Sequence, residues 1–119
     1  MNATFVEQMV DQITEDIYAD FPDLLDKYGE AGKDKCRDDN QHHFRQLHTA
    51  YKLRNDQIFV DYALWLDGIL TSRGMKTTLL IDNFVRIEKV LQETEHTEET
   101  DSYLRLLKKA NEALAAKAE

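Results

Sequence analysis

Residues that break or constrain a polypeptide are scarce in this sequence. Of its 119 residues, one is cysteine, one is proline and four are glycine. The lone Cys36 cannot form an internal disulfide, and nothing near it has the spacing of a zinc site. So few glycines and prolines argue against the many tight turns of a β-sandwich or β-barrel. A chain with few breakers and periodic apolar residues is predicted to form long helices.

Excess positive charge and long apolar runs are also missing. The chain has 23 acidic and 15 basic residues, which give a formal net charge of −8. An acidic surface repels phosphate backbones and anionic lipid headgroups, and the lysines and arginines are scattered rather than clustered. No apolar run is long enough to span a membrane, and no signal peptide is recognisable. We therefore expect a cytoplasmic protein that binds neither nucleic acid nor membranes.

Apolar residues recur at helical spacing along the chain. A capping box at Thr4 to Glu7 predicts the first helix start, Asn55 or Asp56 caps a later helix, and Thr97 or Thr100 caps the last. Pro22 and Gly29 bound a short helix. The predicted helices are approximately 4–20, 22–28, 33–53, 56–73, 77–92 and 98–117. Five long helices in 119 residues predict an all-α fold, a single helical domain over 1–119 packed as a compact five-helix bundle, with globin-like packing as the alternative.

The helix predicted at 33–53 has an unusually polar inward face. Asn40 and His43 lie on the same stripe as Cys36 and Leu47, where a core is expected. Asp39 precedes His43 by one helical turn, so its carboxylate can reach the imidazole and leave the second ring nitrogen available for a ligand. A partly buried histidine satisfied by Asp39, with no further role, is the simpler interpretation.

The sequence offers little for metal binding or covalent catalysis. His42, His43 and His48 have no pair at i,i+4 spacing, and the Glu-x-x-His pattern that ends at His96 occurs only once, whereas dinuclear bundles need it twice. A haem or related tetrapyrrole near His43 is the cofactor alternative, with an aromatic lining that includes Tyr62 and Trp65. A later helix of a globin supplies its proximal histidine, and the corresponding helices here have none. We predict no enzyme activity.

Residues 28–75 contain one pattern that extends beyond composition. It consists of Tyr28-Gly29-Glu30-Ala31-Gly32, Cys36, Asp39, His43, Leu47, Phe59-Val60-Asp61-Tyr62, Trp65, Leu70 and Arg73-Gly74. This pattern resembles the helical region found ahead of the cobalamin-binding module in some bacterial cobalamin-binding regulatory proteins. The resemblance implies a sensory or regulatory helical module. It does not imply cobalamin binding, because the Asp-x-His-x-x-Gly loop of the following module is absent from this sequence.

The resemblance also implies a set of pocket residues. Its matching positions most suited to line a ligand pocket are Asp39, His43, Tyr62, Trp65 and Arg73. Tyr62 and Trp65 lie three residues apart on one predicted helix, so their rings can share a face. We expect a sensor or regulatory domain that binds a small molecule or a protein partner without catalysis. The sequence leaves the ligand, any cofactor and a homodimer open.

Overall fold

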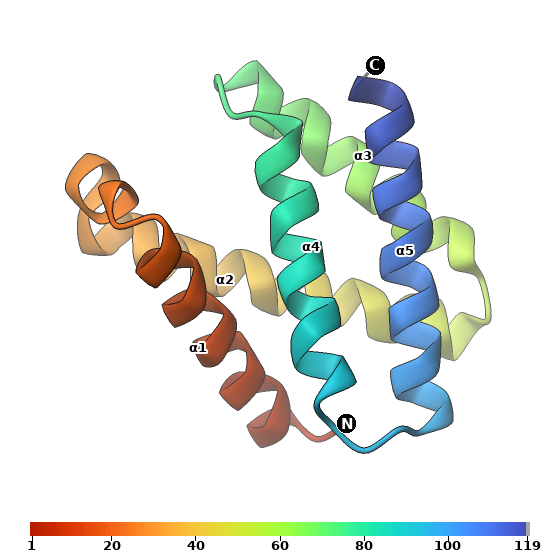
Figure 1. The fold of residues 1–119 in the computed structure, drawn as a ribbon. Coiled ribbons are helices and arrows are strands. Elements are labelled where there is room, and N and C mark those ends of the chain that lie inside the picture. The colour runs from red at the N-terminus through yellow and green to blue at the C-terminus, as the bar shows by residue number, and fades with distance from the viewer. Residues whose placement is uncertain (119) are drawn as a thin grey trace. The chain divides into compact units, whose positions relative to one another are not determined.

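A computed structural model describes residues 1–118 and shows an all-α protein (Figure 1). Helices take up 87% of the chain, and none of the described residues forms a strand. The elements are α1 (Ala3–Asp20), α2 (Asp23–Leu53), α3 (Asp56–Ser72), α4 (Thr77–Gln92) and α5 (Glu98–Ala118). The predicted all-α class with five long helices is confirmed. No helix among the described residues combines the length and the apolar character needed to cross a membrane.

The start of α1 differs from the prediction. Asn2 is the N-cap, and its side-chain oxygen accepts a hydrogen bond from the backbone N–H of Phe5 at 2.8 Å. Thr4 therefore lies inside the helix, and the predicted capping box with Glu7 is wrong. Asparagine caps helices at least as well as threonine does, so the earlier residue begins the helix. The other predicted caps are confirmed, since Asn55 caps α3.

A break at Gly29 divides α2 into a short and a long part, as the sequence predicts. Gly29 has a φ of 68° and a ψ of −168°, a conformation that favours glycine. Gly32 is required for a different reason, because a Cβ placed there would lie only 2.5 Å from the Cβ of Tyr28. The two glycines thus let the chain turn and then resume as one continuous helix to Leu53.

Helices α2 and α3 end in the same hydrogen-bonded motif. The N–H of Asn55 donates to the Ala50 carbonyl at the end of α2, and an equivalent bond of the same 3.0 Å length closes α3. This Schellman motif places one residue in the left-handed region. At the end of α3 that residue is Gly74, with a φ of 85°, as the sequence predicts. At the end of α2 it is Arg54, with a φ of 52°.

The chain divides into two compact units, residues 1–45 and residues 46–119. The division falls inside α2, and the predicted single domain over 1–119 remains a prediction. In the first unit, α1 and the first part of α2 are joined by ion pairs: Lys33 Nζ lies 2.8 Å from Glu15, and Arg37 Nε lies 3.0 Å from Asp11. These contacts hold α1 and α2 side by side.

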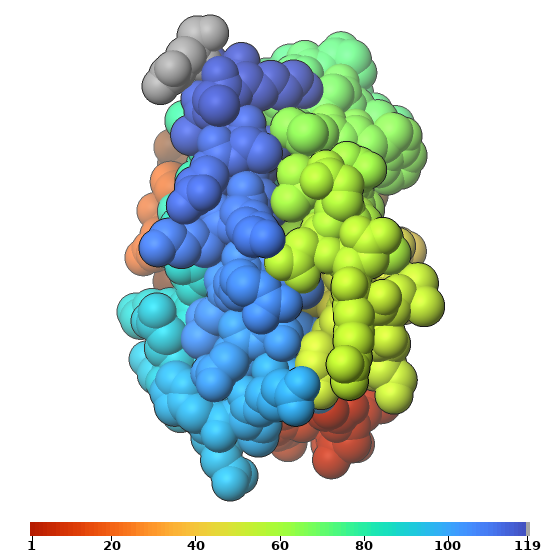
Figure 2. Space-filling model, turned by 90° about the vertical axis from the view of Figure 1, so that its right-hand side faces the viewer, coloured from red at the N-terminus to blue at the C-terminus, as the bar shows by residue number. Residues whose placement is uncertain are grey.

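The second unit consists of the end of α2 with α3, α4 and α5. Helix α5 packs against both α3 and α4 (Figure 1), and Figure 2 shows α3 and α5 next to each other on one face. Its fully buried apolar side chains come from all four of these helices: Leu47, Phe59, Ala63, Phe84, Ile87, Leu91, Leu106, Leu107, Ala110 and Leu114. Polar residues on α5 and on the turn before α3 are therefore fixed relative to one another by a shared core.

The buried face of α3 agrees only in part with the sequence, which predicts an apolar face of Phe59, Tyr62, Trp65, Leu66, Ile69 and Leu70. Phe59 is fully buried, but the Trp65 side chain is 63% exposed. Ala63 and Asp67 are buried instead, at 0% and 1% exposure. Apolar residues occur nearly all round this helix, so periodicity alone did not single out the stripe that contacts α4 and α5.

Candidate functional site

The five residues predicted to line a pocket belong to both units. Asp39 and His43 belong to residues 1–45, whereas Tyr62, Trp65 and Arg73 belong to residues 46–119. Asp39 lies with its carboxylate 2.8 Å from Lys35 Nζ, one turn earlier in α2. The predicted partner of Asp39 was His43, but the carboxylate is engaged with this lysine.

His43 is buried, with 2% of its surface exposed. Burial lowers its pKa to about 3, and the neighbouring His42 acts in the same direction. A paired carboxylate would raise the pKa instead. The imidazole is therefore neutral at physiological pH, which suits a core side chain and also a nitrogen that binds a ligand or metal.

Tyr62 and Trp65 are neighbours on α3, as predicted. Their ring centroids lie 6.4 Å apart with an interplanar angle of 34°. Tyr62 is half-buried and also contacts Phe59, at 5.8 Å between centroids, so the pair runs from the core to the surface. Arg73 is exposed at the C-cap of α3, where its backbone N–H donates to the Leu70 carbonyl at 3.1 Å.

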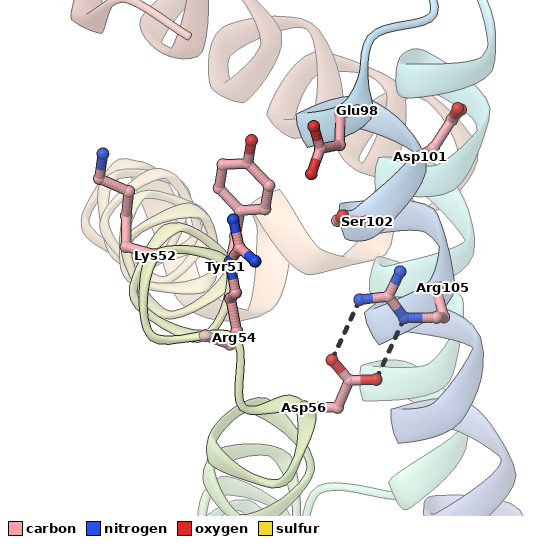
Figure 3. Close-up of a pocket in the computed structure, with 9 residues that line it drawn as sticks. Tyr51, Lys52, Arg54, Asp56, Glu98, Asp101, Ser102 and Arg105 are labelled. Carbon is pink, nitrogen blue, oxygen red and sulfur yellow. Dashed lines mark hydrogen bonds and ion pairs between the residues drawn. The ribbon is translucent and has the colours of Figure 1, made fainter.

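A groove of about 800 Å³ lies in the second unit, at the end of α2 and the start of α5 (Figure 3). Its volume is that of a small-molecule site, although its lining is more polar than is usual for such sites. The lining residues come from α2, the turn after it and α5: Ala50, Tyr51, Lys52, Arg54, Asp56, Glu98, Asp101, Ser102 and Arg105. None of the five residues predicted from the sequence is among them.

An ion-pair network forms one end of the groove. Arg105 Nε and Nη2 each lie 3.1 Å from an oxygen of Asp56, and Lys109 Nζ lies 2.8 Å from the same carboxylate. Hydrogen bonds from Arg105 and then Lys109 lower the pKa of Asp56 to about 2. A bidentate pair fixes the orientation of both side chains. The charges of Arg105 and Asp56 at this end of the groove are therefore already paired with each other.

Other polar groups of the groove are not satisfied in this way. Ser102 lines the groove, and 7% of its surface is exposed. Arg54 on the α2 side and Glu98 on the α5 side are exposed, and within residues 1–118 neither forms an ion pair (Figure 3). A hydroxyl that lines the groove and two unpaired opposite charges provide partners for a polar ligand.

Tyr51 joins the groove to a partly buried hydrogen-bond network. Its ring packs edge-on against Tyr103, with centroids 6.2 Å apart. The Tyr103 hydroxyl donates to Glu99 Oε2 at 3.3 Å and lies 3.4 Å from His48 Nδ1. Burial, together with the Glu99 charge, raises the pKa of Tyr103, so the phenol keeps its proton. The network therefore supports the aromatic wall of the groove.

The structure gives no specific support to a metal or haem site. No group of three or more His, Cys, Asp or Glu side chains among residues 1–118 could hold a metal ion. Burial raises the pKa of the Cys36 thiol, which disfavours the reactive thiolate. His43 is not part of the groove lining, so the groove is not a haem pocket that His43 could serve. The tetrapyrrole alternative remains a prediction, tested by a Soret band in purified protein.

Sequence reasoning did not find the groove. The pair of Asp56 with Arg105 joins residues 49 apart, and no local pattern indicates it. One signal was present: the predicted cap at Asn55 or Asp56 places Arg54 in the turn between two helices, where glycine is the usual residue. An arginine at a position where glycine is usual is a candidate for a functional residue.

Comparisons with protein-family models, with curated proteins and with solved structures find no match to this chain. The resemblance to the helical region of cobalamin-binding regulatory proteins therefore remains a prediction.

Proposed function

We propose that this chain is a small cytoplasmic regulatory domain that binds a polar small molecule in the groove between the end of α2 and the start of α5, without catalysis. One observation carries the proposal: a groove of about 800 Å³ is lined by the Ser102 hydroxyl and by the unpaired charges of Arg54 and Glu98. The charged residues act here as binding groups. The ligand would contact segments that are distant in sequence, which makes the second unit sensitive to its presence.

Ligand screening with mapping of the bound position tests this function. A panel of polar metabolites is added to ¹⁵N-labelled protein, and backbone amide shifts are recorded. At least one compound is expected to shift the amides of Arg54 and Ser102 and to raise the melting temperature, because a ligand that binds only the folded state stabilises it. Ser102→Ala should weaken the binding of that compound. Ser72→Ala, at an exposed site outside the groove lining, should leave its binding unchanged. Binders that shift only amides outside the groove would overturn the proposal.

A second candidate is a homodimer formed through the outer side of α3. Four large side chains there are exposed or half-buried at spacings of four, three and four residues, the pattern of a coiled-coil seam: Ile58, Tyr62, Trp65 and Ile69. The 63% exposure of Trp65 favours this candidate, since large exposed apolar groups mark interaction surfaces. Sedimentation over a range of protein concentrations tests it. Self-association that Trp65→Ser abolishes supports the dimer, and a monomer at every concentration rejects it.

A further inference from the structure

The unpaired positive and negative side chains of the groove come from different segments of the chain. Lys52 and Arg54 lie on the α2 side, whereas Glu98 and Ser102 come from α5 (Figure 3). Within the described chain, Lys52, Arg54 and Glu98 form no ion pair. The remaining arginine, Arg105, is already bound in two places by Asp56. The groove therefore has one unpaired guanidinium, that of Arg54, on its α2 side and one unpaired carboxylate, that of Glu98, on its α5 side.

We infer that the ligand of this groove is a zwitterion of amino-acid type, whose carboxylate binds Arg54 and whose ammonium group binds Glu98. The inference rests on the proposed function and names the chemical class of its ligand. A guanidinium matches a carboxylate in shape and can donate two parallel hydrogen bonds to it. The Ser102 hydroxyl supplies a third polar contact, and the ring of Tyr51 supplies an apolar wall for the ligand's side chain.

The backbone at Arg54 independently indicates a role for this residue. Among residues 1–118 it is the only non-glycine residue with a positive φ, at 52°. The matching position in the same motif at the end of α3 is Gly74, which adopts this conformation without strain. A non-glycine residue whose backbone is held in a sparsely populated conformation beside a groove points to a functional role for its side chain. Glycine would adopt this conformation without strain, but it has no guanidinium with which to bind a ligand in the groove.

The ligand arm of the test uses three related sets of probes. Free L-amino acids are compared with their amides, which lack the carboxylate, and with their N-acetyl derivatives, which lack the ammonium group. Amide shifts at Arg54 and Ser102 report binding. The best amino acid is expected to bind about tenfold or more tightly than either derivative, because each derivative loses one charge-assisted contact.

The protein arm uses variants of the same two charges. Arg54→Gln should weaken the free amino acid about tenfold or more but barely change the amide, which has no carboxylate to lose. Glu98→Gln should also weaken binding of the free amino acid, but it should barely change binding of the N-acetyl derivative, which has no ammonium group to lose. Lys89→Gln removes one positive charge, as Arg54→Gln does, at an exposed site outside the groove, and it should leave binding unchanged.

A glycine exchange separates binding from folding. Arg54→Gly should abolish binding while raising the melting temperature by about 2–5 °C, since glycine relieves the strained φ. Gly74→Arg, the reverse change at the matching position, should lower the melting temperature and leave binding intact.

The outcomes distinguish the two proposals. If N-acetyl derivatives or simple carboxylates bind as well as free amino acids and still require Arg54, the groove is a ligand site but the zwitterion inference is wrong. If none of the probes shifts groove amides while other polar metabolites do, the inference again fails and the proposed function stands. If nothing in either screen perturbs the groove, both fail. An Arg54→Gly variant that is less stable than the wild type would remove the strain argument.

Discussion

His43 has a pKa that its surroundings lower strongly. Its imidazole is buried, and burial lowers its pKa from 6.5 to about 3. The unfolded chain therefore binds a proton in a pH range where the folded chain does not. The stabilisation that comes from keeping His43 neutral is fully present above the unfolded pKa and is lost as the pH falls through the folded value.

Substitution of His43 should accordingly change how stability depends on pH. Between pH 7 and about pH 4.5, the wild type should lose on the order of 2–3 kcal/mol more unfolding free energy than His43→Leu, which has no proton to bind. Urea unfolding at several pH values measures this difference. His96→Gln, at an exposed histidine of the connection before α5, is the control and should keep the wild-type slope. Equal slopes for wild type and His43→Leu would show that the imidazole is accessible to protons in the folded state.

At the scale of elements, one buried carboxylate joins α3 to the end of α5. Asp67 is 1% exposed, and Lys117 Nζ lies 3.0 Å from its Oδ2. Neither carboxylate oxygen accepts a hydrogen bond of good geometry, although the ion-pair distance is short. The charge of Lys117 is therefore the main compensation that the described structure provides for a buried anion. Removal of one partner of such a pair leaves an uncompensated charge.

A double-mutant cycle tests this link between α3 and α5. Lys117→Met should destabilise the fold by about 1–3 kcal/mol, while Asp67→Leu combined with Lys117→Met should be close to the wild type or more stable. Denaturant titration gives both values. Lys108→Met, at an exposed lysine of the same helix, should change stability by less than about 0.5 kcal/mol. If the two lysine variants behave alike, Asp67 does not depend on Lys117.

At the scale of the whole molecule, the boundary between the two units is unusual. It falls between Arg45 and Gln46, inside α2, whereas domain boundaries commonly fall in exposed flexible linkers. A helix that continues across a boundary couples the order of the two sides, since its hydrogen bonds are formed cooperatively. The single domain predicted from the sequence stays a prediction, and on the ground of this helix we expect one cooperative unfolding transition.

Unfolding experiments can decide between one cooperative unit and two. Trp65 fluorescence reports only on residues 46–119, and circular dichroism reports on all helices. We expect the two signals to have the same urea midpoint, as a two-state transition requires. A helix-breaking control, Gln46→Pro, should separate the midpoints by interrupting α2 at the boundary. Two transitions in the wild type would instead show that the units fold independently.

Most of the secondary structure of this protein followed from the sequence alone. The all-α class, the break at Gly29, the Asn55 cap and the bounds of α4 were predicted because each depends on interactions within a few residues. Periodicity, caps and breakers act over one or two helical turns. The burial of the polar residues Asn40 and His43 on the inward side of α2 was readable in the same way.

Which faces and charges meet was decided only by the tertiary structure. Helix α3 carries apolar residues on more than one side, so its packing against α4 and α5 determined that Asp67 is buried and Trp65 exposed. The groove depends on Asp56 and Arg105, which are 49 residues apart and share no sequence pattern. Local rules position residues along a helix, but the rotation of each helix and the pairing of distant charges result from the way that several helices share one core.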